Sequence, residues 1–306
     1  MSVLQLASYT AFGFFVVFVA LKMIRIARMP VHLRWDLYPI PRESGSAYGG
    51  SYFEEVDWWT KPRQASLIRE LRAIAIEILF IQSLFRHNRR LWIFSFPFHL
   101  GLYCLVGFGL LLVIGAMAAS AAVEITAGSP ATFSAGIYYL TIALGSAGWI
   151  LASLGAIGLL LSRIFRAELR KASLRNDYFN LIFLLAVSVS GFLSWAIADQ
   201  EYTHLRGFMQ GLVGFQQSPT IPLLVAVQLW ITVALLFYFP FTHMTHVFGK
   251  YFTYHRVRWE DHPNLRGSRI EKAVTEALGY PLSWAAPHIG KGTWAEAADT
   301  EKRGHE

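Results

Sequence analysis

Cysteine is nearly absent from this sequence. Its 306 residues contain one cysteine, Cys104, which lies inside an apolar run. A single thiol cannot build a disulfide within the chain, a Cys-x-x-Cys pair, a cysteine zinc site or an iron–sulfur centre, and no Cys-x-x-Cys-His haem attachment motif is present. Any redox cofactor must therefore be held by histidine or methionine, or belong to a partner protein.

Charge is also scarce. Charged residues make up 15% of the chain, whereas hydrophobic residues make up 54% and aromatic residues 15%. This composition is typical of a membrane protein. The net charge of +7 could indicate nucleic-acid binding. However, the basic residues lie in blocks between apolar runs, so we expect no nucleic-acid partner.

Five apolar runs reach the length of about 20 residues that a helix needs to cross a bilayer. They cover residues 9–28, 91–119, 133–165, 178–197 and 221–248. We therefore expect an all-α fold, an integral membrane bundle of five transmembrane helices. The first run is followed, not preceded, by positive charge, which is the reverse of a cleavable signal peptide, so we expect this helix to be retained.

Lysine and arginine set the expected orientation, because they are retained on the cytoplasmic side of a membrane. With the N-terminus outside and the C-terminus cytoplasmic, residues 22–90, 163–175 and 250–306 are inside and hold 26 of the 27 Lys and Arg residues. Only Arg206 then lies outside. The opposite orientation would place nearly all of these charges outside.

The polar regions divide the chain into a first helix (1–28), a cytoplasmic loop (29–90), a four-helix membrane core (91–250) and a cytoplasmic tail (251–306). In the loop, proline and glycine indicate irregular chain before residue 67. Apolar residues then recur at helical spacing from Leu67 to Phe85, with charges between them, which predicts an amphipathic helix. It could lie along the lipid interface or dock a partner. In the tail we expect one short helix, Ser268–Leu278, and frayed final residues.

Three of the ten histidines fall within apolar runs: His99, His243 and His246. An imidazole in hydrocarbon is costly unless it is satisfied, so such a histidine indicates a functional site. His99 lies eight residues into its run, roughly 12 Å along a helix, and His246 lies just before Lys250. Two imidazoles on neighbouring helices at a common depth can ligate one haem iron from both faces. The alternative is that His99 packs in the core and the histidine pair lies at the interface.

The flanking residues are compatible with a porphyrin. Gly101, Gly107 and Gly109 would leave room beside the second helix, although small residues also let helices pack closely. Ser95 and Thr242 lie one turn before His99 and His246 and could accept the second imidazole N–H. Basic residues at the inner boundary could bind haem propionates. Alternatively, they only fix the orientation of the protein in the membrane. These residues are Arg89, Arg90, Arg163 and Lys250.

Two segments resemble the gamma subunit family of respiratory nitrate reductase, a five-helix cytochrome b, and especially the membrane cytochromes of heterodisulfide-reductase-like and dissimilatory sulfite-reduction complexes. They are Leu91-Trp-Ile-Phe-Ser-Phe-Pro-Phe-His-Leu-Gly101 and Phe239-Pro-Phe-Thr-His-Met-Thr-His-Val-Phe248. The resemblance implies that His99 and His246 are the axial ligands of haem b. His243, which shares about the same helix face as His246, is the alternative ligand or a haem-edge residue.

The sequence departs from the family pattern at the positions that hold the family's second haem. That pattern has histidines where this chain has Gly109 and Gln228. We therefore expect one haem b, and a second only with an unusual ligand.

By resemblance, the protein is a membrane anchor subunit in the cytoplasmic membrane of a prokaryote, active in anaerobic respiration. It would transfer electrons between menaquinone, or another quinone, and a cytoplasmic iron–sulfur subunit of the heterodisulfide reductase kind. Alone it would not act on a soluble substrate. Polar residues available to the quinone are Gln228, His243 and Gln82. Alternatives are a membrane subunit without cofactor, structural or a carrier, and a cytochrome b subunit of a hydrogenase or formate dehydrogenase.

Overall fold

The computed structural model describes residues 1–28, 56–57, 60, 66–253, 265–282 and 292–298. Regular structure in these residues is helical, apart from an isolated bridge between Pro281 and Thr293. The prediction of an all-α fold is confirmed. The expected irregular chain before residue 67 and the frayed last residues lie mostly outside the described residues.

The described helices include five that are long and apolar enough to cross a membrane, which confirms the predicted number of spans. They are α1 (Val3–Ala27), α4 (Arg89–Ser120), α5 (Thr132–Phe165), α7 (Arg175–Leu193) with a π-helical turn to Ala198, and α9 (Leu223–Tyr238) with a 3-10 turn to Phe241. The shorter helices are α2 (Leu67–Phe80), α3 (Gln82–His87), α6 (Ala167–Ala172), α8 (Thr203–Val213), α10 (His246–Thr253), α11 (Arg269–Leu278) and α12 (Trp294–Ala298).

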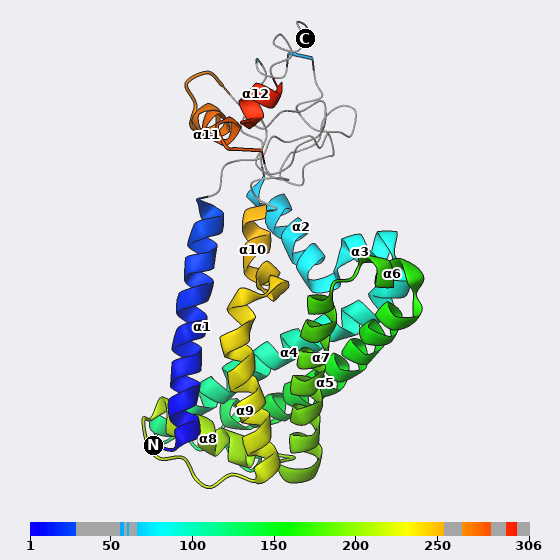
Figure 1. The fold of residues 1–306 in the computed structure, drawn as a ribbon. Helices are drawn as coiled ribbons and strands as arrows, with labels where there is room; N and C mark the ends of the chain where they lie inside the picture. The colour runs from blue at the N-terminus through cyan, green and yellow to red at the C-terminus, as the bar shows by residue number, and fades with distance from the viewer. Residues whose placement is uncertain (29–55, 58–59, 61–65, 254–264, 283–291, 299–306) are drawn as a thin grey trace, which may run out of the picture. The chain divides into compact units, whose positions relative to one another are not determined.

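The chain divides into two compact units, Met1–Val19 with Ile76–Met244, and Ala20–Ala75 with Thr245–Glu306. In the first unit, neighbouring helices pack in the order α4, α5, α7 and α9, and α8 packs against α4 (Figure 1). Because the four long helices follow one another in both sequence and contact, the unit is an up-and-down bundle.

Glycines bring α4 and α5 together. A Cβ at Gly101 would lie 2.9 Å from the Gly148 carbonyl oxygen and from the Ala152 Cα, and a Cβ at Gly155 would lie 2.6 Å from the Phe98 Cα. Membrane helices gain little from the hydrophobic effect between helices, so close backbone approach is what stabilises such a pair. Gly101 therefore serves helix packing. Gly109, by contrast, has no atom within 4 Å of its Cβ position.

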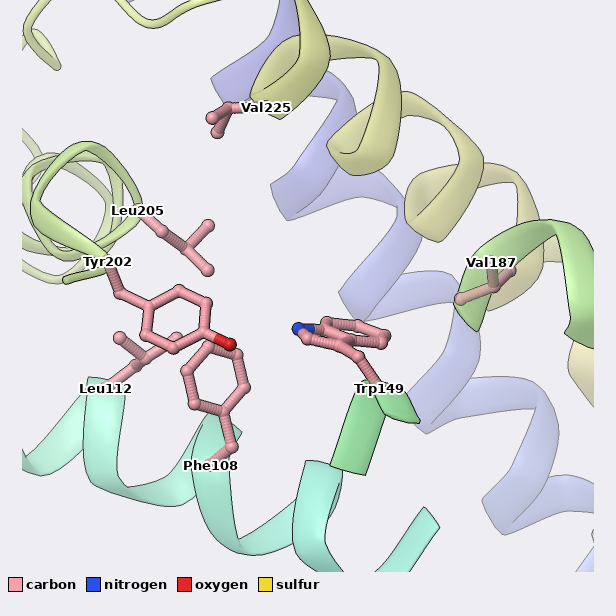
Figure 2. Close-up of a cluster of buried hydrophobic side chains, with 7 residues drawn as sticks. All are labelled: Phe108, Leu112, Trp149, Val187, Tyr202, Leu205 and Val225. Carbon is pink, nitrogen blue, oxygen red and sulfur yellow. The ribbon is translucent and has the colours of Figure 1, made fainter. Parts of the chain in front are cut away.

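A cluster of buried aromatic and aliphatic side chains from α4, α5, α7, α8 and α9 packs within the first unit (Figure 2). Its members are Phe108, Leu112, Trp149, Val187, Tyr202, Leu205 and Val225. Tyr202 enters it from the loop before α8, and its ring lies against Gly145, where a Cβ would be 2.6 Å from the phenol oxygen. Figure 2 shows this hydroxyl and the Trp149 indole nitrogen pointing toward one another. Neither atom has a hydrogen-bond partner among the described residues.

Asp199 begins α8. Its side chain is 5% exposed and accepts the backbone N–H groups of His204 (3.1 Å) and Leu205 (2.9 Å). The first N–H groups of a helix have no partner within the helix, so a carboxylate there stabilises it. Arg206 donates to the Tyr138 carbonyl at 3.0 Å, and burial lowers the pKa of its guanidinium. These two charged residues therefore have structural roles.

The first half of α1 packs on the first unit through polar contacts and a small apolar cluster. Gln5 is fully buried, and its amide donates to the Gln216 carbonyl at 2.8 Å, while the Tyr9 hydroxyl donates to the Leu212 carbonyl at 2.5 Å. Phe14 packs on Phe237 with ring centroids 5.1 Å apart. The expected start of this helix at residue 9 was too late, because residues 3–8 are also helical.

The fifth span is not the continuous helix expected to residue 248. Helix α9 ends at Tyr238, two 3-10 turns follow (Phe239–Phe241 and His243–Thr245), and α10 begins at His246. Pro240 has no N–H to continue the helical hydrogen bonding. At the break, the Thr242 hydroxyl donates to the Phe239 carbonyl (2.8 Å) and accepts from the Met244 N–H (3.1 Å).

The predicted amphipathic helix is also interrupted. Helix α2 ends at Phe80 and α3 begins at Gln82, because Ile81 has left-handed backbone angles (φ 49°, ψ 51°). A β-branched residue rarely adopts this conformation. The periodic apolar pattern that crosses residue 81 gives no sign of the elbow.

The second unit contains α10, α11 and α12. Ser268 caps α11 by accepting the Glu271 N–H at 3.1 Å, and Gly279 follows the helix, so the short helix expected in the tail is confirmed. Helix α10 lies beside the end of α1, since a Cβ at Gly249 would be 3.7 Å from Ile26.

Candidate functional site

His99 lies on α4, in the first unit, and is half-buried. Its Nδ1 is 2.7 Å from the carbonyl oxygen of Ser95, one turn earlier, and 3.4 Å from the Ser95 hydroxyl. Since a carbonyl can only accept, Nδ1 carries the proton and donates. In the neutral ring this leaves Nε2 unprotonated, the form in which a histidine binds a metal.

The aromatic neighbours of His99 fix its surroundings. The Phe98 ring is edge-on at 5.4 Å between centroids, and the Tyr103 ring is tilted at 6.5 Å. Tyr103 also donates its hydroxyl to the Ile78 carbonyl of α2 at 2.6 Å. The donor chemistry of His99 fits an axial haem ligand, because an oriented neutral imidazole is what haem iron takes from a protein.

His243, also in the first unit, faces α7. Its Nδ1 is 3.4 Å from the Asn180 side-chain nitrogen, and its Nε2 is 3.9 Å from an Asp177 oxygen. Asn180 is 5% exposed and accepts the Tyr238 hydroxyl at 2.7 Å. Asp177 in turn lies 3.9 Å from Arg163. These residues form a polar chain that runs from α9 across α7 to the end of α5.

His246 is the first residue of α10 and belongs to the second unit, where its side chain is exposed. The described residues contain no group of three or more His, Cys, Asp and Glu side chains that could hold a metal ion. Two ligating residues suffice to hold a haem, so a haem site need not contain a group of this kind.

The basic residues proposed for haem propionates have various contacts. The Arg89 guanidinium lies over the Phe85 ring at 4.7 Å, and Arg90 is exposed. Arg163 donates to the Ser173 hydroxyl at 2.8 Å, besides its contact with Asp177. Lys250 lies in α10, and its side chain is outside the described part of the chain.

The remaining quinone candidates occupy different places. Gln228 is buried on α9, and its amide donates to Thr232 on the same helix at 3.1 Å. Gln82 is half-buried at the first position of α3.

The positions of a second haem do not fit that group. Gly109 has no side chain to ligate iron, and the Gln228 amide is paired within its helix. The buried cluster of Figure 2 includes Phe108 and Val225, which are close in sequence to these two positions.

The sequence analysis did not single out Asn180, Tyr238 or Tyr103. Asn180 carried a usable signal, since a buried amide within an apolar run is costly and usually has a partner. The two tyrosines gave none, because tyrosine is common in membrane helices and only the fold brings each hydroxyl to its acceptor.

The fold and these side chains define a multi-span helical membrane protein with a pre-oriented histidine in its bundle. Residues 81–260, more than half of the chain, match the family described as nitrate reductase gamma subunit, and the chain belongs to this family.

A curated relative from Archaeoglobus fulgidus, named Hdr-like menaquinol oxidoreductase cytochrome b-like subunit, is 32% identical over 110 residues. The match covers 34% of this chain and 33% of that protein, so the chain spans about a third of the relative's length. No solved structure matches this chain significantly.

Proposed function

We propose that this protein is a membrane cytochrome b subunit that holds one haem b through His99 and His246. It passes electrons between a quinone and a partner protein. The family membership and the name of the Archaeoglobus fulgidus relative support this class of function.

The observation that carries the proposal is the hydrogen bond from His99 Nδ1 to the Ser95 carbonyl at 2.7 Å. It orients the ring and favours the neutral tautomer in which Nε2, the nitrogen that would ligate iron, carries no proton. When bound, haem iron with two imidazole ligands supplies one-electron transfer and has no open position for a substrate.

We assign the second ligand to His246, as the resemblance to the family implies, and give His243 another role. Both ring nitrogens of His243 face polar groups of α7, Asn180 and Asp177. Turning this ring toward an iron would cost both contacts and leave the buried Asn180 amide with one partner fewer. The break after Tyr238 makes His246 the first residue of a separate helix, so its direction does not follow from that of His243.

His243 is also the best placed residue for quinone chemistry. A quinone that gains two electrons must also gain two protons, and these must come from the protein or water. The ring of His243 is 62% exposed, and it lies next to Asp177 and next to Asn180, which Tyr238 contacts. This polar chain can hold a proton at His243 and pass it on, whereas the Gln228 amide cannot exchange one at neutral pH.

The partner we propose is a cytoplasmic iron–sulfur subunit of the heterodisulfide reductase kind, and the quinone is menaquinone. With one cysteine, the chain itself cannot hold an iron–sulfur cluster. The distribution of lysine and arginine supports an N-terminus outside and a C-terminus in the cytoplasm, in a prokaryotic cytoplasmic membrane.

No structural observation favours the alternative of a cofactor-free carrier. A transporter needs polar or charged groups that face a substrate path. Asp199, the acidic residue at the end of the fourth span, is occupied as the cap of α8.

Absorption spectra of the detergent-purified protein test the proposal. The wild type should show a dithionite-reduced b-type band and about one haem per chain by extraction. His99→Ala and His246→Ala should each lose the band, while His204→Ala on α8, the matched control, keeps it. A wild-type protein without the band, or a His99→Ala variant that retains it in full, would overturn the proposal.

A further inference from the structure

We infer that the last turn of α2 forms one wall of the His99 site, and that Tyr103 is the positioning residue that holds it there. This inference rests on the proposed function, because it takes His99 as a haem ligand.

The end of α2 contacts α4 on both sides of His99. Phe96, three residues before His99, stacks on Phe80 with ring centroids 6.4 Å apart and planes at 13°. Tyr103, four residues after His99, donates its hydroxyl to the Ile78 carbonyl at 2.6 Å. Residues at these spacings share one helix face. The last turn of α2 therefore passes along the face of α4 that carries His99.

The carbonyls at the end of a helix lack partners within the helix. In α2, the Ile78 carbonyl accepts from Tyr103, and the Phe80 carbonyl accepts from the Trp92 indole at 2.8 Å. Both donors belong to α4. The helix that carries His99 thus supplies the groups that complete the end of α2.

The elbow after this turn is strained and needs such support. Ile81 adopts left-handed backbone angles, which are unfavourable for a β-branched residue. The Glu77 carboxylate accepts the Ser83 N–H at 3.0 Å across the elbow. Strain of this kind persists only where surrounding contacts hold it, and the Tyr103 and Trp92 hydrogen bonds lie within three residues of it.

A wall beside His99 has a consequence for the haem. Water stabilises the more highly charged oxidised iron, so a site that is closed to water has a higher reduction potential. Releasing the α2 turn should admit water and lower the potential, without removing either ligand.

The test compares Tyr103→Phe with Tyr139→Phe, a tyrosine on α5 that is 58% exposed. Spectroelectrochemical titration measures the reduction potential, and hydrogen–deuterium exchange measures the amides of residues 77–88. Tyr103→Phe should keep the haem band, shift the potential downward and accelerate exchange in this segment, while Tyr139→Phe changes neither. Trp92→Phe, which removes the second hydrogen bond, should act in the same direction.

Retention of the haem with an unchanged potential overturns the inference, whether or not the exchange becomes faster. If His99→Ala loses the haem band and Tyr103→Phe keeps it, the proposed function is supported whatever the reduction potential shows. The proposed function and this inference can therefore fail separately. If Tyr103→Phe fails to fold, the Trp92→Phe result decides by the same criteria.

Discussion

The Nδ1 of His99 lies 2.7 Å from the backbone carbonyl oxygen of Ser95, but 3.4 Å from the hydroxyl of the same residue. The shorter contact is the one that orients the imidazole, and it goes to the main chain. The sequence predicts Ser95 as an acceptor, and in the structure its carbonyl is the principal one.

Ser95→Ala should therefore keep the haem. The substitution removes the hydroxyl but leaves the carbonyl, so Nδ1 still has its principal acceptor and the ring keeps this orienting hydrogen bond. We expect haem content within about 20% of wild type, since one weak contact of a few tenths of a kcal/mol is lost. The reduced absorption spectrum measures this, and loss of the band comparable to that in His99→Ala would contradict it.

His243→Ala should keep the haem band, whereas His246→Ala should lose it. The reason is that the ring of His243 is held by Asn180 and Asp177 on α7. Reduction of the purified protein by a soluble menaquinol analogue should nevertheless slow about tenfold or more in His243→Ala, because a proton acceptor is removed. His87→Ala, on the exposed end of α3, is the control for a nonspecific effect. The reverse result, loss of haem in His243→Ala only, would exchange the roles of the two histidines.

The number and approximate extent of the membrane helices could be predicted because hydrocarbon thickness imposes a minimum length on an apolar run. The break in the fifth span carried a signal, since Pro240 is followed by the polar residues Thr242 and His243. The elbow at Ile81 carried none, because the spacing of apolar residues continues through it. Hydrophobic pattern reports which side chains avoid water, and it is insensitive to a local change of backbone direction.

The candidate site residues stay predictions. A histidine within an apolar run is costly to bury, and this singled out His99, His243 and His246. Their partners were harder to find, because Asn180 and Tyr103 act through contacts between helices that are far apart in sequence. A search for buried amides within the spans would have found Asn180, but nothing in the sequence joins Tyr103 to the Ile78 carbonyl.

Gly101→Ala should destabilise the bundle, and Gly109→Ala on the same helix should not. The new methyl group at residue 101 would lie 2.9 Å from the Ala152 Cα, a backbone atom that can move only if α5 moves, whereas residue 109 has open space. Overpacking of this kind costs about 1–3 kcal/mol. Thermal unfolding in detergent, followed by circular dichroism, should show a lower midpoint for Gly101→Ala only. Equal midpoints would mean that the two helices are not in close contact at Gly101.

Tyr202→Phe should protect the protein against alkaline unfolding. Burial raises the pKa of the Tyr202 phenol, so the folded state favours the neutral form. An unfolded tyrosine ionises near pH ~10. Below that pH the stabilisation is complete, and it is lost as the pH rises further, because only the unfolded state can release the proton.

Phenylalanine carries no proton to lose and fits the same space beside Gly145. At neutral pH the substitution should change stability by about 1 kcal/mol or less, since the hydroxyl has no hydrogen-bond partner among the described residues. Thermal midpoints measured from about pH 8 to pH 11 should therefore fall less steeply in Tyr202→Phe than in wild type. Tyr139→Phe, which changes an exposed tyrosine, should follow the wild-type curve. Parallel curves for wild type and Tyr202→Phe would show that the Tyr202 phenol ionises in the folded bundle as readily as in the unfolded chain.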